Sequence, residues 1–144
     1  HKINIKRYQK FMFILVVILF FTLAFSGCVN KDLVSTITPE EKNNLIVLKG
    51  KAVNSKIVKP MTQMAKFAYD TTSHENWFDY QYNNVNAKIT KETSRFIYFE
   101  LELELGKDID YDEKYHFRAG MYYDVGGSIL PDEPVFGEDL VFET

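Results

Sequence analysis

The chain has 144 residues, of which 46% are hydrophobic and 15% aromatic, and this composition excludes a disordered protein and suits one ordinary domain. The formal charge is -3, but the only charged residues before Cys28 are basic, so the remainder carries 13 basic and 20 acidic residues. Because nucleic acids and anionic lipid surfaces both attract basic proteins, this acidic remainder argues against either as a partner. A single cysteine also excludes an internal disulfide.

Residues 1–27 have the order of a signal peptide. A basic stretch over residues 2–10 is followed by the uncharged residues 11–25 and then by Ser26 and Gly27, which are small. The uncharged run has 15 residues, a length typical of an export signal and shorter than the roughly 18 that a spanning helix needs. The sequence therefore predicts that the rest of the chain is exported.

Cys28 comes directly after this segment. The run Phe25-Ser26-Gly27-Cys28 resembles the lipobox of prokaryotic lipoproteins, although Phe25 stands where an aliphatic residue is usual. The resemblance implies that Cys28 carries a lipid such as palmitate, which holds the protein at the outer face of the cell membrane. Acylation would also remove a reactive thiol from a chain sent to an oxidising compartment. The alternative is an uncleaved anchor helix running through Val29, which places the same residues outside.

Residues 28–44 are predicted to be the lipidated cysteine and a tether that contains a short helix. Thr38 has the position of a helix N-cap, Pro39 the first helical position, and Glu41 lies three residues after the cap. Strand-like residues begin at Leu45, so any helix here is short.

Residues 45–144 are predicted to form a β-sandwich, and residues 96–105 give the strongest strand pattern. Ile97, Phe99, Leu101, Leu103 and Leu105 fall on one face, whereas Glu100, Glu102 and Glu104 fall on the other. This alternation indicates a half-buried antiparallel strand with one solvated face.

Five further strands are predicted from shorter patterns, at residues 45–53, 77–82, 85–90, 115–123 and 140–142. The apolar residues of segment 61–69 fit both a helix and a strand, so both readings stay open. Repeated short strands separated by turns are typical of an all-β sandwich.

The last third of the chain has a familiar pattern. Residues 115–119 (Tyr-His-Phe-Arg-Ala), the Gly126-Gly127 turn and the final Phe142-Glu143-Thr144 resemble the second half of a fibronectin type III-like domain. The resemblance implies an immunoglobulin-like antiparallel β-sandwich. It also implies that Tyr115 is a corner residue with a buried ring, whose hydroxyl hydrogen-bonds the backbone upstream.

Four aromatic residues fall within six positions, at Trp77, Phe78, Tyr80 and Tyr82. Because a strand buries alternate positions, at least one of them should face outward, and we treat all four as candidate ligand-binding residues. Exposed rings beside Glu75 and Asp79 could stack on a sugar or hold a protein partner. The alternative is that Trp77 belongs to the core.

The acidic run Asp108, Asp110 and Asp112 has the opening spacing of a calcium loop. However, Glu113 stands where that loop needs Gly, and Ala119 where it needs a bidentate Glu, so we expect a solvated connection and no metal site.

No recognisable catalytic motif surrounds the two histidines of the exported part, His74 and His116. The sequence therefore predicts a membrane-anchored cell-surface lipoprotein whose non-catalytic domain serves binding, adhesion or spacing. Its partners would be the membrane, through the lipid, and an unknown surface protein or glycan, with no cofactor and no nucleic acid. The alternative is a small extracytoplasmic hydrolase or an enzyme-inhibitor or accessory subunit, which would need a cleft or a protruding loop.

Overall fold

The structure is a computed structural model that describes residues 33–124 and 131–144. The predicted signal peptide, Cys28 and the Gly126-Gly127 turn lie outside the described residues. Within the two described ranges, no helix has the length and apolar character needed to cross a membrane.

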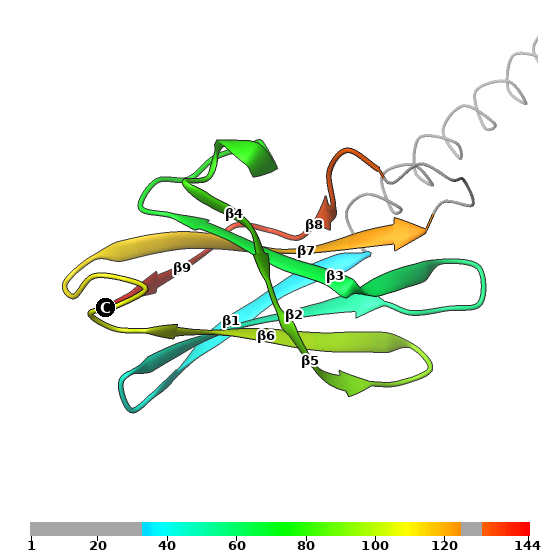
Figure 1. The fold of residues 1–144 in the computed structure, drawn as a ribbon, viewed down its shortest axis with the longest axis horizontal. Helices are drawn as coiled ribbons and strands as arrows, with labels where there is room; N and C mark the ends of the chain where they lie inside the picture. Colours follow the sequence, from blue (N-terminus) through cyan, green and yellow to red (C-terminus); the bar gives the residue numbers. More distant parts are fainter. Residues whose placement is uncertain (1–32, 125–130) are drawn as a thin grey trace, which may run out of the picture. The chain divides into compact units, whose positions relative to one another are not determined.

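The described chain is all-β, with two antiparallel sheets and one short 3₁₀ helix, η1 (Trp77–Asp79). The strands are β1 (Val34–Lys42), β2 (Leu45–Val53), β3 (Lys59–Asp70), β4 (Tyr82–Asn86), β5 (Lys88–Glu92), β6 (Phe96–Glu104), β7 (Lys114–Asp124), β8 (Val135–Phe136) and β9 (Leu140–Glu143). The first sheet has the order β1-β2-β6-β5, and the second has the order β4-β3-β7, with β8 and β9 both paired to β7 (Figure 1).

The core lies between the two sheets, as a β-sandwich requires. Phe99 of β6 contacts Phe67 of β3, with ring centroids 5.4 Å apart, and Phe67 in turn contacts Phe117 of β7. Every second residue of β6 and β7 joins this core, so the two alternating patterns are confirmed.

The strands define two ends, which we name after the residues found there. At the Leu33 end, Val53 pairs with Phe96, and the turns 54–58 and 93–95 lie beside Leu33. At the Thr144 end, Leu45 pairs with Glu104, next to the connections 71–81 and 105–113. In Figure 1 the Thr144 end, marked C, lies at the left, and the β2–β3 turn lies at the right.

The predicted helix at Thr38 is wrong. β1 runs from Val34 to Lys42 and pairs with β2, so most of the predicted tether belongs to the first sheet and the sandwich begins before residue 45. The capping pattern is local, and the hydrogen bonds of the ladder outweigh it. Pro39 falls within the register shift between Ile37 and Glu40, where its missing N–H costs little.

Two other predicted strands need correction. Residues 77–82 are not a strand, because η1 occupies Trp77–Asp79 and β4 begins only at Tyr82. The predicted strand 85–90 is two strands: the chain leaves the second sheet after β4, passes Ala87 and enters the first sheet as β5. The ambiguous segment 61–69 is strand, within β3, and the predictions for 45–53 and 140–142 are confirmed by β2 and β9.

Tyr115 occupies the predicted corner. Its side chain is buried, its ring stacks on Phe142 with a centroid distance of 5.2 Å, and its hydroxyl oxygen accepts a hydrogen bond of 2.9 Å from the Asp110 N–H. The predicted hydrogen bond to the upstream backbone is therefore confirmed, and it fixes the connection between β6 and β7.

Thr36 joins β1 to the opposite sheet. Its N–H donates to Oε1 of Glu138 at 2.8 Å, and its hydroxyl oxygen accepts from the Ala119 N–H at 3.2 Å. The N–H and the hydroxyl oxygen of this buried polar residue therefore both have partners, and the bond to Ala119 links β1 to β7 of the other sheet. Gly137 permits the approach, since a Cβ there would lie 2.6 Å from the Thr36 nitrogen.

Candidate functional site

The four candidate aromatic residues form two pairs. Trp77 and Tyr80 are 0% and 1% exposed, whereas Phe78 and Tyr82 are 48% and 43% exposed. The 3₁₀ turn explains the division, because residues three apart lie on the same side of such a helix. The alternative prediction for Trp77, a core residue, is therefore correct, and only Phe78 and Tyr82 can meet a ligand without rearrangement.

Trp77 covers the outer face of the second sheet. It packs with Ala68 of β3 and with Phe136 of β8, whose ring centroid lies 5.8 Å from its own. Its indole N–H donates to Oδ1 of Asn84 at 3.0 Å, so the polar atom of this buried ring is also satisfied. Connection 71–81 thus folds back onto the sheet and forms a second, smaller core.

Arg118 of β7 stabilises the position of connection 71–81 on the outer face of the second sheet. It lies on the outer side of β7 and donates from Nε to the Tyr80 hydroxyl at 2.9 Å, and from its terminal nitrogens to the carbonyls of Gly137 at 2.8 Å and His74 at 3.3 Å. Its guanidinium also lies over the Phe136 ring, 5.4 Å from the centroid. Because its donors are engaged internally, Arg118 stabilises connection 71–81 and does not present a free cation.

Two histidine–carboxylate pairs flank Arg118. His74 Nε2 lies 2.9 Å from Oδ2 of Asp70, and His116 Nδ1 lies 2.9 Å from Oδ2 of Asp139. Burial by itself would raise the pKa of Asp70, but hydrogen bonds from His74 and from two backbone N–H groups outweigh it, so this pKa lies below its usual value. The first pair ties connection 71–81 to β3, and the second ties the segment between β8 and β9 to β7.

Ser73 also lies beside this group, which raises the question of nucleophilic chemistry. Its hydroxyl donates to Asp139, the same carboxylate that His116 contacts. A nucleophilic serine needs an imidazole nitrogen to accept its proton, with the carboxylate on the far side of that ring. The arrangement here places the carboxylate between the two, so it orients Ser73 and does not activate it.

Two aspartates of the acidic connection 105–113 have roles in its backbone conformation. Asp108 accepts a hydrogen bond from the Glu104 N–H at 2.8 Å, and Asp112 adopts a positive φ of 57°, which aspartate tolerates well. Among residues 33–124 and 131–144, no group of three or more His, Cys, Asp or Glu side chains is arranged to hold a metal ion. The carboxylate of Asp108 therefore shapes the turn.

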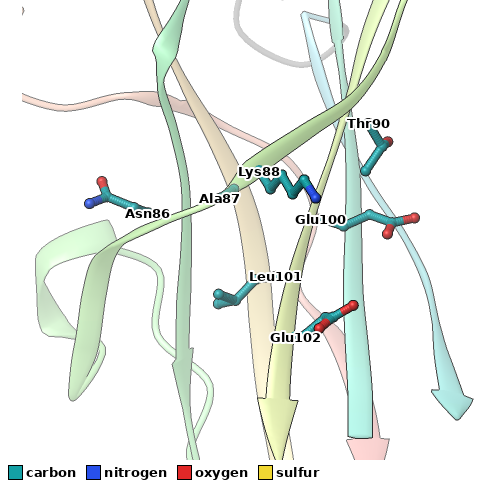
Figure 2. Close-up of a pocket in the computed structure, with 7 residues that line it drawn as sticks. All are labelled: Asn86, Ala87, Lys88, Thr90, Glu100, Leu101 and Glu102. Atoms are coloured by element: carbon teal, nitrogen blue, oxygen red, sulfur yellow. The ribbon is translucent and has the colours of Figure 1, made fainter.

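A shallow groove of about 350 Å³ lies where the chain crosses from β4 to β5. Ala87 and Leu101 supply apolar surface, and Lys88, Glu100 and Glu102 supply charge. Figure 2 shows Leu101 pointing away from the side on which Glu100 and Glu102 lie. Glu100 lies 3.9 Å from Lys49, and its register partner on β5 is Lys88, so lysines occupy the neighbouring positions on both adjacent strands. The groove offers little that would select a ligand.

The Thr144 end carries a more distinctive surface. The connections that leave the strands at this end carry exposed aromatic side chains: Phe78 lies in connection 71–81, Tyr82 follows it at the start of β4, and Tyr111 lies in connection 105–113. We call these three residues the aromatic surface. Tyr82 is held rigidly, because its ring stacks on Tyr69 at 4.8 Å with an interplanar angle of 21°. Burial raises the pKa of Tyr69 to about 12, and the nearby Tyr82 and the Asp108 carboxylate add to the effect.

Tyr111 was not among the residues predicted from sequence. It follows the acidic run, and its hydroxyl lies 3.3 Å from Oδ1 of Asn44, which fixes the ring at the surface. The acidic pattern of residues 108–113 predicts only a solvated connection, and it does not single out Tyr111. An aromatic residue within a strongly acidic connection is the signal that could have identified it.

A scan of protein-family models found no match to this chain, and a search of curated proteins found no significant similarity.

Proposed function

We propose that this chain is an extracytoplasmic, membrane-anchored binding protein. In this proposal Cys28 carries a lipid after cleavage of the signal peptide, and the β-sandwich presents its Thr144 end to a protein or glycan at the cell surface. The observation that carries the proposal is that Leu33 lies at one end of the sandwich, whereas connections 71–81 and 105–113, which carry the aromatic surface, leave the strands at the other end, marked C in Figure 1.

Leu33 is fixed firmly at its end of the domain. Its carbonyl accepts hydrogen bonds from the Val53 N–H at 2.8 Å and from the Tyr123 hydroxyl at 3.2 Å. Only four residues separate it from Cys28 along the chain. A lipid on Cys28 would therefore hold the Leu33 end near the membrane and direct the Thr144 end outward.

The topology supports an immunoglobulin-like, fibronectin type III-like domain. The order β1-β2-β6-β5 matches strands A, B, E and D of a constant-type immunoglobulin domain, and β3 and β7 take the places of C and F. Strands β8 and β9 together form an interrupted last strand, and Tyr115 has the contacts of a tyrosine corner. Such domains commonly bind through residues at one end of the sandwich.

The exposed aromatic and acidic side chains favour binding over catalysis as the function. Exposed, rigid rings such as Tyr82 can stack on a sugar or against a protein side chain with little loss of conformational freedom. Ser73 donates its hydroxyl hydrogen to the Asp139 carboxylate and not to an imidazole nitrogen. The acidic surroundings of the aromatic surface also suit a partner with cationic groups, which bind both to carboxylates and to aromatic faces.

The lipid anchor is tested by Cys28→Ser in cells fed labelled palmitate. The wild-type chain should carry the label and stay with the membrane fraction, and the variant should lose the label and leave that fraction. Ser26→Ala serves as the matched control, because it preserves a small residue before the cysteine. Unchanged labelling of the Cys28→Ser variant would contradict lipidation, whereas lost labelling with full membrane retention would favour an uncleaved anchor helix.

A further inference from the structure

Basic side chains collect at the Leu33 end, on the side of the first sheet. We call Lys51, Lys56, Lys91 and Arg95 the basic rim. The two turns that carry Lys56 and Arg95 are joined, because Asn54 donates from its N–H to the Arg95 carbonyl at 2.7 Å and from its amide to the Thr93 carbonyl at 2.8 Å. The rim is therefore one surface and does not depend on separate flexible loops.

Ile57 lies at the tip of this surface and is 93% exposed. A single exposed apolar residue needs no special explanation. Here, however, the turn around it is closed by the Val58 N–H donating to the Ser55 hydroxyl at 2.9 Å, and by the Ser55 N–H donating to the Val58 carbonyl at 3.0 Å. The turn thus projects Ile57 outward between Lys56 and Val58.

Two lysines of the basic rim lie over aromatic rings on the outer face of the first sheet. Lys51 Nζ is 4.7 Å from the centroid of Phe96, and Lys91 Nζ is 5.8 Å from that of Tyr98. Aromatic rings beside lysines are typical of surfaces that meet the boundary between lipid and water. Within the described ranges, none of the four rim residues forms an ion pair, so their charges remain available.

The domain is acidic on average, but its charge is unevenly distributed. Glu92, the last residue of β5, lies beside the four basic residues of the rim, whereas Asp124, Asp132 and Glu133 lie towards the Leu33 end on the side of the second sheet. The Thr144 end carries Asp108, Asp110, Asp112 and Glu113 within one connection. An anionic surface would therefore attract the first-sheet side of the Leu33 end and repel the Thr144 end.

We propose that the basic rim rests on anionic phospholipid headgroups, with Ile57 entering the interface. This inference rests on the proposed lipid at Cys28. The chain from Cys28 to Leu33, five residue steps with four residues between, spans at most about 18 Å when fully extended, so it would keep the rim within reach of the bilayer. Each basic residue near an anionic bilayer strengthens binding about fivefold. The rim thus orients the domain, which the lipid alone would leave free to rotate.

The test uses the lipidated full chain in vesicles of phosphatidylcholine, with and without phosphatidylglycerol. Ile57→Cys provides the only free thiol when the lipid occupies Cys28, and a fluorophore placed there is challenged with acrylamide, a neutral water-soluble quencher. Tyr111→Cys is the matched label at the Thr144 end. Flotation of the same samples measures anchoring separately, and circular dichroism checks that each variant is folded.

We expect anionic vesicles to reduce quenching at position 57 severalfold while leaving position 111 unchanged. Adding Lys56→Glu and Arg95→Glu should restore quenching at position 57, whereas Lys107→Glu, which alters an exposed lysine of the Thr144 end, should not. If the chain floats with the vesicles and position 57 stays as quenchable as position 111, the rim does not contact the membrane and the anchor proposal stands. A chain that does not float overturns both.

Discussion

Gly120 of β7 lies directly against the six-membered ring of Trp77, so that a Cβ at position 120 would be 2.5 Å from Cη2 of that ring. Because Gly120 has no side chain, the indole can occupy this position on the outer face of the second sheet. Gly120→Ala should destabilise the domain by about 1 to 3 kcal/mol, because the ring must move out of a close-packed site. Urea denaturation followed by circular dichroism measures this cost.

The same experiment with Trp77→Ala shows whether the indole is the cause. Trp77→Ala alone should cost about 3 to 5 kcal/mol. In that background the additional change Gly120→Ala should be neutral or slightly stabilising, because glycine is unfavourable within a strand and the clash is gone. Equal costs of Gly120→Ala in both backgrounds would contradict a direct contact. The emission of Trp77, the sole tryptophan, should be blue-shifted and protected from quenchers in the wild type.

Tyr115→Phe should destabilise the domain by about 0.5 to 1.5 kcal/mol, the usual net worth of one hydrogen bond. The change removes the acceptor of the Asp110 N–H and leaves the buried ring in place. Tyr111→Phe is the control, since its ring is exposed and its hydroxyl bonds are long. A Tyr115→Phe variant as stable as the control would show that the corner depends on ring packing alone.

Asp70 makes the stability of the domain sensitive to acid. The pKa of Asp70 in the folded protein lies below its ordinary value of 3.8, because its hydrogen bonds outweigh the effect of burial. In acid the unfolded chain therefore binds more protons, so this contribution is present above pH 3.8 and is lost as the pH falls through the folded pKa. Denaturation midpoints from neutral to acidic pH should fall less steeply for Asp70→Asn than for the wild type.

Glu75→Gln is the control for that pH profile, because this exposed carboxylate lies in the same connection 71–81. It should leave the slope unchanged. An Asp70→Asn variant with the slope of the wild type would show that other carboxylates govern the acid transition.

The aromatic surface should contribute to ligand binding and add little to the stability of the fold. Phe78→Ala should cost no more than about 0.5 kcal/mol of stability, since half of its surface is already in water. If the surface serves binding, Phe78→Ala combined with Tyr82→Ala should weaken attachment to an oligosaccharide array or to a lysine-rich peptide by about 30-fold, the effect of a central contact residue. Val141→Ala, another exposed apolar site, is the control and should bind as the wild type does. Equal binding by the double variant and the control would exclude the aromatic surface as the binding site.

Strands with one polar face could be predicted accurately from the sequence. Residues 99–105 alternate phenylalanine or leucine with glutamate, and β6 (Phe96–Glu104) ends one residue before the predicted strand 96–105. Segments whose conformation depends on distant contacts could not. Thr38 and Pro39 satisfy a local helix rule, but their strand is decided by pairing with β2, which is far stronger than a capping preference.

The candidate site was also predicted only in part, because the conformation of connection 71–81 depends on contacts with distant residues. The sequence identified an aromatic segment, and two of its four residues are exposed. It could not reveal that Trp77 and Tyr80 cover the outer face of a sheet, because a repeat of two or of 3.6 describes a single element and not a connection folded over another element. The spacing of three between these residues and the small residues Ala68 and Gly120 on the covered face were the available signals.

If the chain is anchored to a membrane as proposed, the irregularities of the outer strands affect whether neighbouring copies aggregate there. β1 is interrupted beside Pro39, β5 shifts register between Ile89 and Lys91, β4 spans five residues with Asn84 at a positive φ, and β8 and β9 are separate pieces. Regular exposed edges are templates on which further chains can add as strands. Proteins confined to a surface meet one another often, so such edges would promote aggregation. With each edge broken or bearing lysine, crowded copies of this domain should stay separate.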